Sequence, residues 1–273
     1  MRTHASEPTA RAAERSDEVF DHVVVGIDET HESLVAAAQA GVLRAPGGQL
    51  VLVAVAERYL AAHAGMDALH AGERVVAETS TELARARELV DADEAMLASG
   101  RLVDVLCSEC SRRKATLVAV GVRPHRRLAA LTFGGHDVDA LHGSRCSVLI
   151  ARPGWGPAKP ERIVVAVDGS PASRAAEATT RSLGRRLGRD VVPLVGLTSD
   201  LDLEVLRAER EDALLEPGSL VDAVGAAASR SSLVVVGRER KRSRRRGSEL
   251  AEQIVYTARC SVLVVEHDGG APA

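Results

Sequence analysis

One stretch of the sequence occurs twice, and it constrains the fold more than any other feature. The first copy spans residues 116–151 and the second spans residues 232–266. Each copy has an apolar run that ends on glycine, a loop to a Gly-X pair, a short helical segment, and a second apolar run opened by Arg-Cys-Ser. Short, valine-rich apolar runs are typical of strands buried in a parallel sheet. We therefore predict that one α/β domain is present in duplicate.

The segments that precede the two copies also correspond. In the first half we expect strands at 22–27, 50–56 and 94–99, and helices at about 31–45, 67–90 and 100–114. In the second half the series restarts with a strand at 162–167, a helix at 171–187 and a strand at 191–197. Strands that alternate with helices predict parallel sheets, and a repeat this long indicates a duplicated domain.

The second copy is shorter than the first. Asp28 and Asp168 are 140 residues apart, whereas Gly121 and Gly237 are 116 residues apart, so the second half lacks 24 residues between these points. When the two copies are aligned, the missing residues correspond to the long helix expected at 67–90. We expect the counterpart of that helix to be absent or vestigial.

The domain boundaries follow from local composition. Residues 1–17 are small and polar, and we expect a disordered tail there. The first domain is predicted at 18–152 and the shortened second domain at 161–268, with a linker at 153–160. Prolines and glycines crowd this linker, so it neither continues a strand nor starts a helix.

Topology alone predicts a ligand site in each half. In open α/β sheets, ligands bind at the carboxyl ends of the strands, where the strand order reverses. In the first half, Asp28 and Gly121 stand at the carboxyl ends of the first and fourth expected strands. In the second half, Asp168 and Gly237 take these positions. Glycines let the backbone approach an anion closely, and the free N–H groups of a helix N-terminus point at it. The pattern is therefore suited to holding phosphate.

Composition and charge exclude several classes of protein. The apolar fraction of 45% and the charged fraction of 27% are ordinary for a globular protein, and the net charge of −3 argues against general polyanion binding. No apolar run approaches the ~18–20 residues of a membrane span. Residues 1–17 lack the apolar core of a secretory signal. We therefore expect a cytoplasmic protein that does not enter the membrane.

The four cysteines are interpreted as core residues. Cys107 and Cys110 spell C-x-x-C, but they lie in an apolar helical stripe and no second pair completes a zinc site. Cys146 and Cys260 open equivalent strands and are expected to pack inside. No metal site is predicted. No nucleophile elbow, Walker loop or paired catalytic carboxylates occur, so we predict no catalytic residues and no enzyme.

Taken together, these features resemble the universal stress protein family. The first strand ends in aspartate, as in Asp168-Gly169-Ser170, a later strand ends in glycine, a loop leads to Gly-Ser, and the last strand is opened by cysteine. The resemblance covers about 20–153 and 161–267, which implies a tandem member of the family. It also implies two domains of adenine-nucleotide alpha-hydrolase type, each a mostly parallel, five-stranded, doubly wound sheet.

The resemblance also implies ATP binding through the pattern G-x2-G-x9-G-(S/T), with the aspartate of the first strand near the nucleoside. The residues carried over by position are Asp28, Gly121, Gly134, Gly135, Asp168, Gly237, Arg240, Gly247 and Ser248.

Both loops depart from the family pattern. In the first half, Pro124 replaces the second glycine of the pattern, and Gly135 stands where the pattern has serine or threonine. Arg240 replaces that glycine in the second half, whose loop is three residues shorter. The alternative is a strand-to-helix connection whose glycines only form turns.

A basic loop at 238–246 carries seven cationic side chains in nine residues. It is either a solvated loop, a set of arginines that replace lost glycine contacts to phosphate, or a nucleic-acid patch. None of the five aromatic residues lies in it, so stacking on bases is poorly supported and nucleic acid is not the expected partner.

The function expected from the sequence is therefore a regulatory binding protein that is gated by an adenine nucleotide. The alternative is a scaffold that has lost nucleotide binding and acts through protein partners, whose identity the sequence does not give. We further expect the final strands, 146–151 and 261–266, to pair as an intramolecular pseudo-dimer, because exposed edges invite aggregation. A homodimer is left open.

Overall fold

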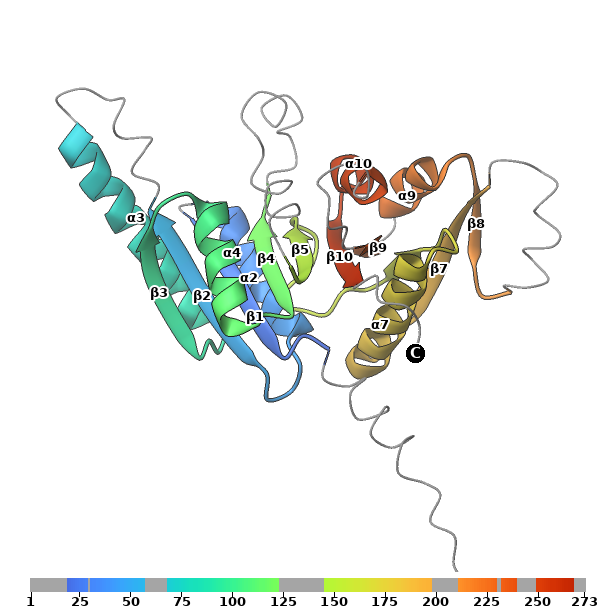
Figure 1. Cartoon of the computed structure of the whole chain (residues 1–273), viewed down its shortest axis with the longest axis horizontal. Coiled ribbons are helices and arrows are strands. Elements are labelled where there is room, and N and C mark those ends of the chain that lie inside the picture. Colours follow the sequence, from blue (N-terminus) through green and yellow to red (C-terminus); the bar gives the residue numbers. More distant parts are fainter. Residues whose placement is uncertain are drawn as a thin grey trace, which may run out of the picture.

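The structure is a computed structural model that describes residues 19–28, 30–56, 68–122, 145–197, 211–229, 232–239 and 249–267. These residues form one ten-stranded sheet with helices on both of its faces (Figure 1). The tail predicted at 1–17 lies outside the described residues.

The order of the elements confirms the α/β fold predicted from the sequence. The first half contains β1 His22–Ile27, α2 His31–Leu43, β2 Gln49–Ala56, α3 Ala68–Leu89, β3 Glu94–Ser99, α4 Leu102–Arg113, β4 Leu117–Gly121 and β5 Ser147–Ala151. The second half contains β6 Ile163–Ala166, α7 Pro171–Leu187, β7 Val191–Leu197, β8 Leu214–Pro217, α9 Leu220–Ala228, β9 Leu233–Glu239, α10 Glu249–Thr257 and β10 Ser261–His267. Residues 198–210 lie outside the described ranges, so the loss of a second long helix stays a prediction.

The sheet has the strand order β3-β2-β1-β4-β5-β10-β9-β6-β7-β8. The strands within each half are parallel to one another. In each half the chain builds outward on one side of its first strand and then returns to the other side. The strand order therefore reverses between β1 and β4, and again between β6 and β9.

The two halves meet through β5 and β10, the only antiparallel pair among the described strands. Leu149 lies opposite Leu263, so the predicted pairing of the final strands is confirmed. Two serines mark the local two-fold symmetry of this pair. The backbone N–H of Arg152 donates to Ser261 Oγ at 3.0 Å, and that of Glu266 donates to Ser147 Oγ at 3.2 Å.

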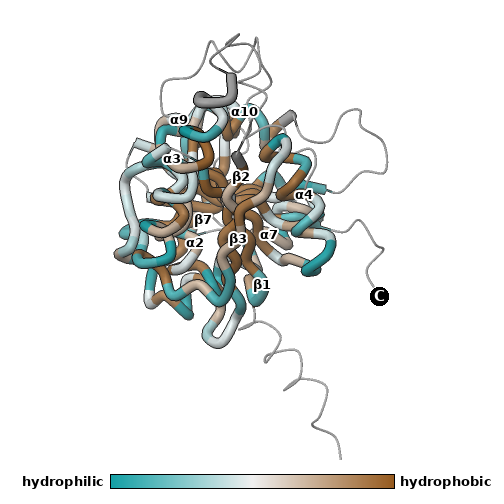
Figure 2. Tube along the Cα trace, turned by 90° about the vertical axis from the view of Figure 1, so that its left-hand side faces the viewer, coloured by the Kyte–Doolittle hydropathy of each residue, from teal (hydrophilic) through white to brown (hydrophobic). Residues whose placement is uncertain are grey.

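Alternating side chains divide the core into two layers. On one face α2, α3 and α7 pack on alternate residues such as Val25 and Val235, and on the other face α4, α9 and α10 pack on residues such as Val24 and Val234. Each layer runs through both halves, and hydrophobic residues fill the centre of the molecule (Figure 2). None of the helices that the structure describes is long and apolar enough to cross a membrane.

Local signals account for the bounds of α7. Ser170 caps α7 by accepting a hydrogen bond from the backbone N–H of Ser173 at 3.1 Å, and Pro171 occupies the first turn, where its missing N–H costs nothing. Gly188 ends the helix with a positive φ of 65°. The predicted bounds of 171–187 are therefore confirmed.

The segment between the halves packs tightly against both of them. Trp155 is buried, and Gln39 of α2 donates to the carbonyl oxygens of Arg152 and Trp155 at 2.8 and 2.9 Å. The buried guanidinium of Arg152 donates to the carbonyl oxygen of Val255 in α10 at 2.7 Å. Ser261 of β10 donates to Gln39 Oε1 at 2.8 Å. The halves are therefore joined by buried polar contacts as well as by the sheet.

Candidate functional site

The predicted site residues of each half lie at one edge of the sheet. β1 and β4 are parallel neighbours, with Val25 opposite Ala119, so Asp28 and Gly121 both lie at the carboxyl edge. β6 and β9 repeat this arrangement, which places Asp168 and Gly237 together in the second half. The structure thus brings each aspartate to the reversal of strand order, as the sequence predicted.

Both aspartates organise the turn between strand and helix. Asp28 Oδ1 accepts hydrogen bonds from the backbone N–H of Thr30 at 2.9 Å and from its hydroxyl at 2.6 Å. Asp168 Oδ1 accepts from the backbone N–H of Ser170 at 2.9 Å. This fixed geometry holds a carboxylate at the start of α2 and of α7, where the positive end of the helix favours negative charge.

The ionisation of Asp168 follows from two opposing causes. Partial burial raises the pKa of its carboxyl group, and hydrogen bonds from Ser170 and Ser173 lower it. The hydrogen bonds prevail, so the pKa lies below its ordinary value. Asp168 is therefore a carboxylate at neutral pH and can only accept hydrogen bonds from a ligand.

Gly121 and Gly237 allow a close approach of backbone to backbone. A Cβ at Gly121 would lie 2.1 Å from the carbonyl oxygen of Glu32 in α2. A Cβ at Gly237 would lie 2.1 Å from the carbonyl oxygen of Ala172 in α7. Only glycine fits between strand end and helix at these distances. Packing alone therefore requires both glycines, whether or not a ligand binds nearby.

The remaining predicted site residues lie in the two loops that follow β4 and β9. Gly134, Gly135, Arg240, Gly247 and Ser248 all fall outside the described residues. The described chain resumes with α10 at Glu249, directly after the Gly-Ser pair of the second half. The helical run that was expected after this pair is therefore confirmed.

Sequence reasoning placed Arg238 in a basic loop, but this residue is part of the core. Arg238 belongs to β9, is 7% exposed, and donates from Nε to Glu266 Oε2 at 2.7 Å. Its Nη2 donates to the same oxygen, and Glu266 is its register partner in β10. The solvated-loop interpretation is wrong for Arg238. The signal that was available is the position of Glu266 at the matching end of the last strand.

The first half lacks this ion pair. Val122 follows Gly121 where Arg238 follows Gly237, and the N–H of Val122 donates to the carbonyl oxygen of Ala151 at 3.0 Å. Arg152 stands where the second half has Glu266. The two carboxyl edges therefore differ in charge although they share a backbone plan.

The cysteines behave as core residues. Cys110, Cys146 and Cys260 are buried and Cys107 is partly buried, and all four are free thiols. A hydrogen bond with Cys146 and burial raise the pKa of Cys110, and burial raises the pKa of Cys260 to about 11. Such thiols are protonated and unreactive at neutral pH. Among the described residues no cluster of His, Cys, Asp or Glu has the arrangement of a metal site.

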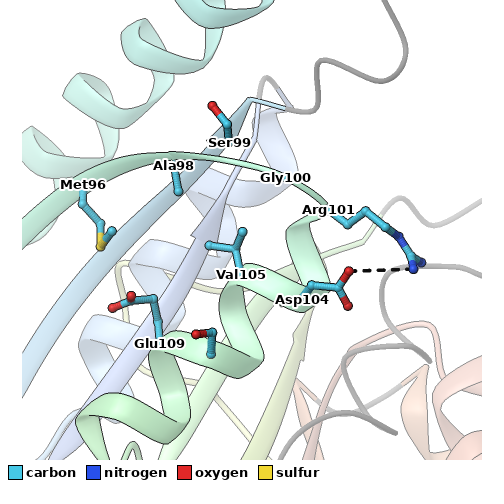
Figure 3. Close-up of a pocket in the computed structure, with 9 residues that line it drawn as sticks. Met96, Ala98, Ser99, Gly100, Arg101, Asp104, Val105 and Glu109 are labelled. Carbon is cyan, nitrogen blue, oxygen red and sulfur yellow. Dashed lines mark ion pairs between the residues drawn. The ribbon is translucent and has the colours of Figure 1, made fainter. Parts of the chain in front are cut away.

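A groove of about 460 Å³ lies away from the predicted site residues, between β3 and α4. Met96 and Ala98 of β3 and Val105 of α4 form its apolar part, and Arg101, Asp104 and Glu109 stand at its rim (Figure 3). None of the residues predicted for nucleotide binding lines it.

Comparison with known proteins identifies the first half. Residues 20–152 match the model of the Universal stress protein family. No curated protein matches the chain.

Solved structures extend the likeness to the whole fold. A universal stress protein from Archaeoglobus fulgidus DSM 4304 has a TM-score of 0.70 at 15% identity, over 91% of this chain and 99% of that one. A putative universal stress protein from Pseudomonas aeruginosa UCBPP-PA14 has a TM-score of 0.61 at 16% identity, over 92% and 95%. A protein of unknown function from Pseudomonas aeruginosa PAO1 has a TM-score of 0.61 at 16% identity, over 93% and 95%. At such identities the likeness shows a common fold, which here includes both halves.

Proposed function

Because residues 20–152 match the universal stress protein family, we propose that the chain is a regulatory binding protein whose ligand is an adenine nucleotide, ATP. The proposed sites lie at the carboxyl ends of β1 and β4 and of β6 and β9. One observation carries the proposal. In both halves, an aspartate fixed by hydrogen bonds, a glycine in the last part of a strand and the first turn of a helix meet where the strand order reverses. Ligands of open α/β sheets bind at such points.

The residues have separate roles in this proposal. Asp28 and Asp168 accept hydrogen bonds from the nucleoside, since a carboxylate can only accept. The phosphates extend toward the loops that follow β4 and β9. Their contacts come from the predicted loop residues Gly134, Gly135, Arg240, Gly247 and Ser248.

We assign the larger share of the affinity to the second half. Its Gly-Ser pair directly precedes α10, and the N-terminus of a helix favours a bound anion. The arginines at 240–246 add charge-assisted hydrogen bonds to phosphate. Proline at 124 in the first loop has no N–H to offer. Because both loops depart from the family pattern, the affinity is expected to be weak.

Isothermal titration with ATP tests the proposal. Asp168→Ala should weaken binding more than Asp28→Ala, because each removes the acceptor for the nucleoside and the second site is the stronger one. Asp190→Ala is the matched control, since Asp190 is an exposed acid in the turn between α7 and β7. No heat from the unmodified chain contradicts the proposed function. Equal losses, or a loss in Asp28→Ala alone, contradict the assignment to the second half.

A scaffold without nucleotide is the second candidate. The observation that favours it is the close approach at Gly121 and Gly237, which explains both glycines without any ligand. Under this alternative neither ATP nor adenosine gives heat with any variant. For the favoured function we propose binding without catalysis, so ATP incubated with the chain should release no phosphate.

A further inference from the structure

Three of the four cysteines lie near one another in the first half. Cys107 and Cys110 belong to α4, and Cys146 directly precedes β5. Cys110 and Cys146 are both buried in the core layer that α4 covers. The proposed nucleotide sites lie at the carboxyl edge of the sheet, so these thiols have no part in them.

The backbone brings Cys110 and Cys146 to the same place in the fold. Where α4 ends, the N–H of Ala115 donates to the carbonyl oxygen of Cys110 at 2.9 Å. At the start of β5, the N–H of Ser147 donates to the carbonyl oxygen of Thr116 at 3.2 Å. Both cysteines therefore stand beside the start of β4. Their side chains meet in the layer under α4, where the thiol of Cys110 shares a hydrogen bond with that of Cys146.

The second half shows that packing alone does not require this pair. Cys260 corresponds to Cys146, and Ala228 corresponds to Cys110 when the Leu-Val-Asp that opens both helices is aligned. Ala228 and Cys260 are buried in the same core layer as the pair. An alanine is therefore sufficient at the helix position, and the first half holds a second thiol where the fold does not need one.

We propose that Cys110 and Cys146 are a redox-sensitive dithiol that a peroxide converts into a disulfide between α4 and β5. One sulfur, as the thiolate, attacks an oxygen of hydrogen peroxide, the O–O bond breaks, and a sulfenic acid forms. The second sulfur then attacks the first, and the sulfenic oxygen leaves as water. The two thiols lose two electrons and two protons in total, and the peroxide is reduced to two molecules of water.

Burial makes this reaction slow and selective. The thiolate is the reactive form, and the hydrogen bond with Cys146 and burial both raise the pKa of Cys110. The pair therefore ignores traces of oxidant, and only peroxide in excess traps its small thiolate fraction. Once one sulfur is oxidised, the other is already beside it. The sulfenic acid is therefore consumed by the disulfide before it meets a second peroxide.

The disulfide would act as a staple in the core of the first half. It ties the last turn of α4 to β5, which pairs with β10 and so joins the two halves. A cross-link between residues 110 and 146 restricts the unfolded chain, whereas the folded chain needs little movement to form it. Oxidation should therefore raise the thermal midpoint by about 4 °C or more, and reduction should restore the original value.

Peptide mapping of the full chain tests the proposal. The folded chain is incubated with millimolar hydrogen peroxide, treated with catalase, and then unfolded in iodoacetamide so that every remaining thiol is blocked. Digestion without reductant should give a cross-linked product that contains Cys110 and Cys146. Cys260, which has no thiol partner in its half, should be recovered in the alkylated form. Dithiothreitol should remove the cross-link.

Single substitutions assign the pair. Cys110→Ala copies the second half, so it should fold, and it should lose both the cross-link and the rise in thermal midpoint. Cys107→Ala and Cys260→Ala are the matched controls and should keep both, with circular dichroism confirming the fold of each variant. Full alkylation of Cys110 and Cys146 after peroxide overturns the proposal. A cross-link that survives Cys110→Ala but is lost in Cys107→Ala overturns it, as does an oxidised chain that melts no higher than the reduced one.

Discussion

Replacing Gly237 with alanine should destabilise the chain, because a Cβ at this position would overlap backbone atoms of α7. It would lie 2.1 Å from the carbonyl oxygen of Ala172, about 1.3 Å closer than the 3.4 Å at which ordinary contact begins. The next nearest atoms are the carbonyl carbon of Ala172 at 2.3 Å and the backbone nitrogen of Ser173 at 2.7 Å. All three are backbone atoms of the first turn of α7. No side-chain rotation can therefore relieve the contact.

The cost follows from what must move. Overpacking in a core typically costs about 1–3 kcal/mol, and a clash with backbone belongs at the upper end. A loss of about 3 kcal/mol would lower the thermal midpoint by roughly 6–12 °C in a chain of this size. Gly121→Ala should behave alike, since its Cβ meets Glu32 at the same 2.1 Å. Urea and thermal unfolding, followed by circular dichroism, measure both changes.

Gly72→Ala is the matched control for this experiment. Gly72 lies within α3, and a Cβ there meets nothing within 4 Å. Alanine is the better helix former, so this substitution should stabilise the chain by about 0.5–1 kcal/mol. If Gly237→Ala unfolds at the same urea concentration as the unmodified chain, the close-approach argument fails.

Three further predictions concern charge and thiols. Glu266→Gln removes the negative partner of the buried Arg238 guanidinium and should cost about 3–5 kcal/mol in urea unfolding, whereas replacing both residues with Leu and Met should cost far less. Asp168 has a lowered pKa, so its contribution to stability is present above its unfolded pKa and is lost as pH falls through the lower folded value. Acid unfolding of Asp168→Asn should lack that loss below about pH 4, and an unchanged acid transition would refute the argument. In a thiol titration of the native chain Cys107 should react first, and fast reaction of the buried thiols would contradict their burial.

The sequence was sufficient for the fold because its signals are local and repeated. Apolar runs, a proline at a helix start and glycines at strand ends indicate elements within short windows, and the duplication checks each one against its copy. The pairing of β5 with β10 was predicted because a terminal apolar strand needs cover on its edge. No such signal exists for side chains that meet across long separations.

The contacts between the halves illustrate this limit. Gln39 reaches the carbonyl oxygen of Trp155 from 116 residues away, and nothing in either local sequence indicates the contact. Arg238 was misplaced for the same reason, since it was grouped with the arginines beside it in the sequence, whereas its partner Glu266 is 28 residues on. Asp28 and Asp168 lie at the carboxyl edge of the sheet, as the strand order led us to expect, and their role in binding stays a prediction. The packing role of Gly237 against α7 was not predicted, because this close contact between backbone atoms is visible only in the three-dimensional structure.

Native mass spectrometry of the purified chain tests the proposed nucleotide site most directly. The chain should carry the added mass of an adenine nucleotide, either retained from the cell or acquired when ATP is added. Replacing the arginines at 244, 245 and 246 with serine should reduce binding of ATP more than binding of adenosine, because the lost contacts are to phosphate. A chain that stays free of nucleotide at saturating ATP would contradict the account.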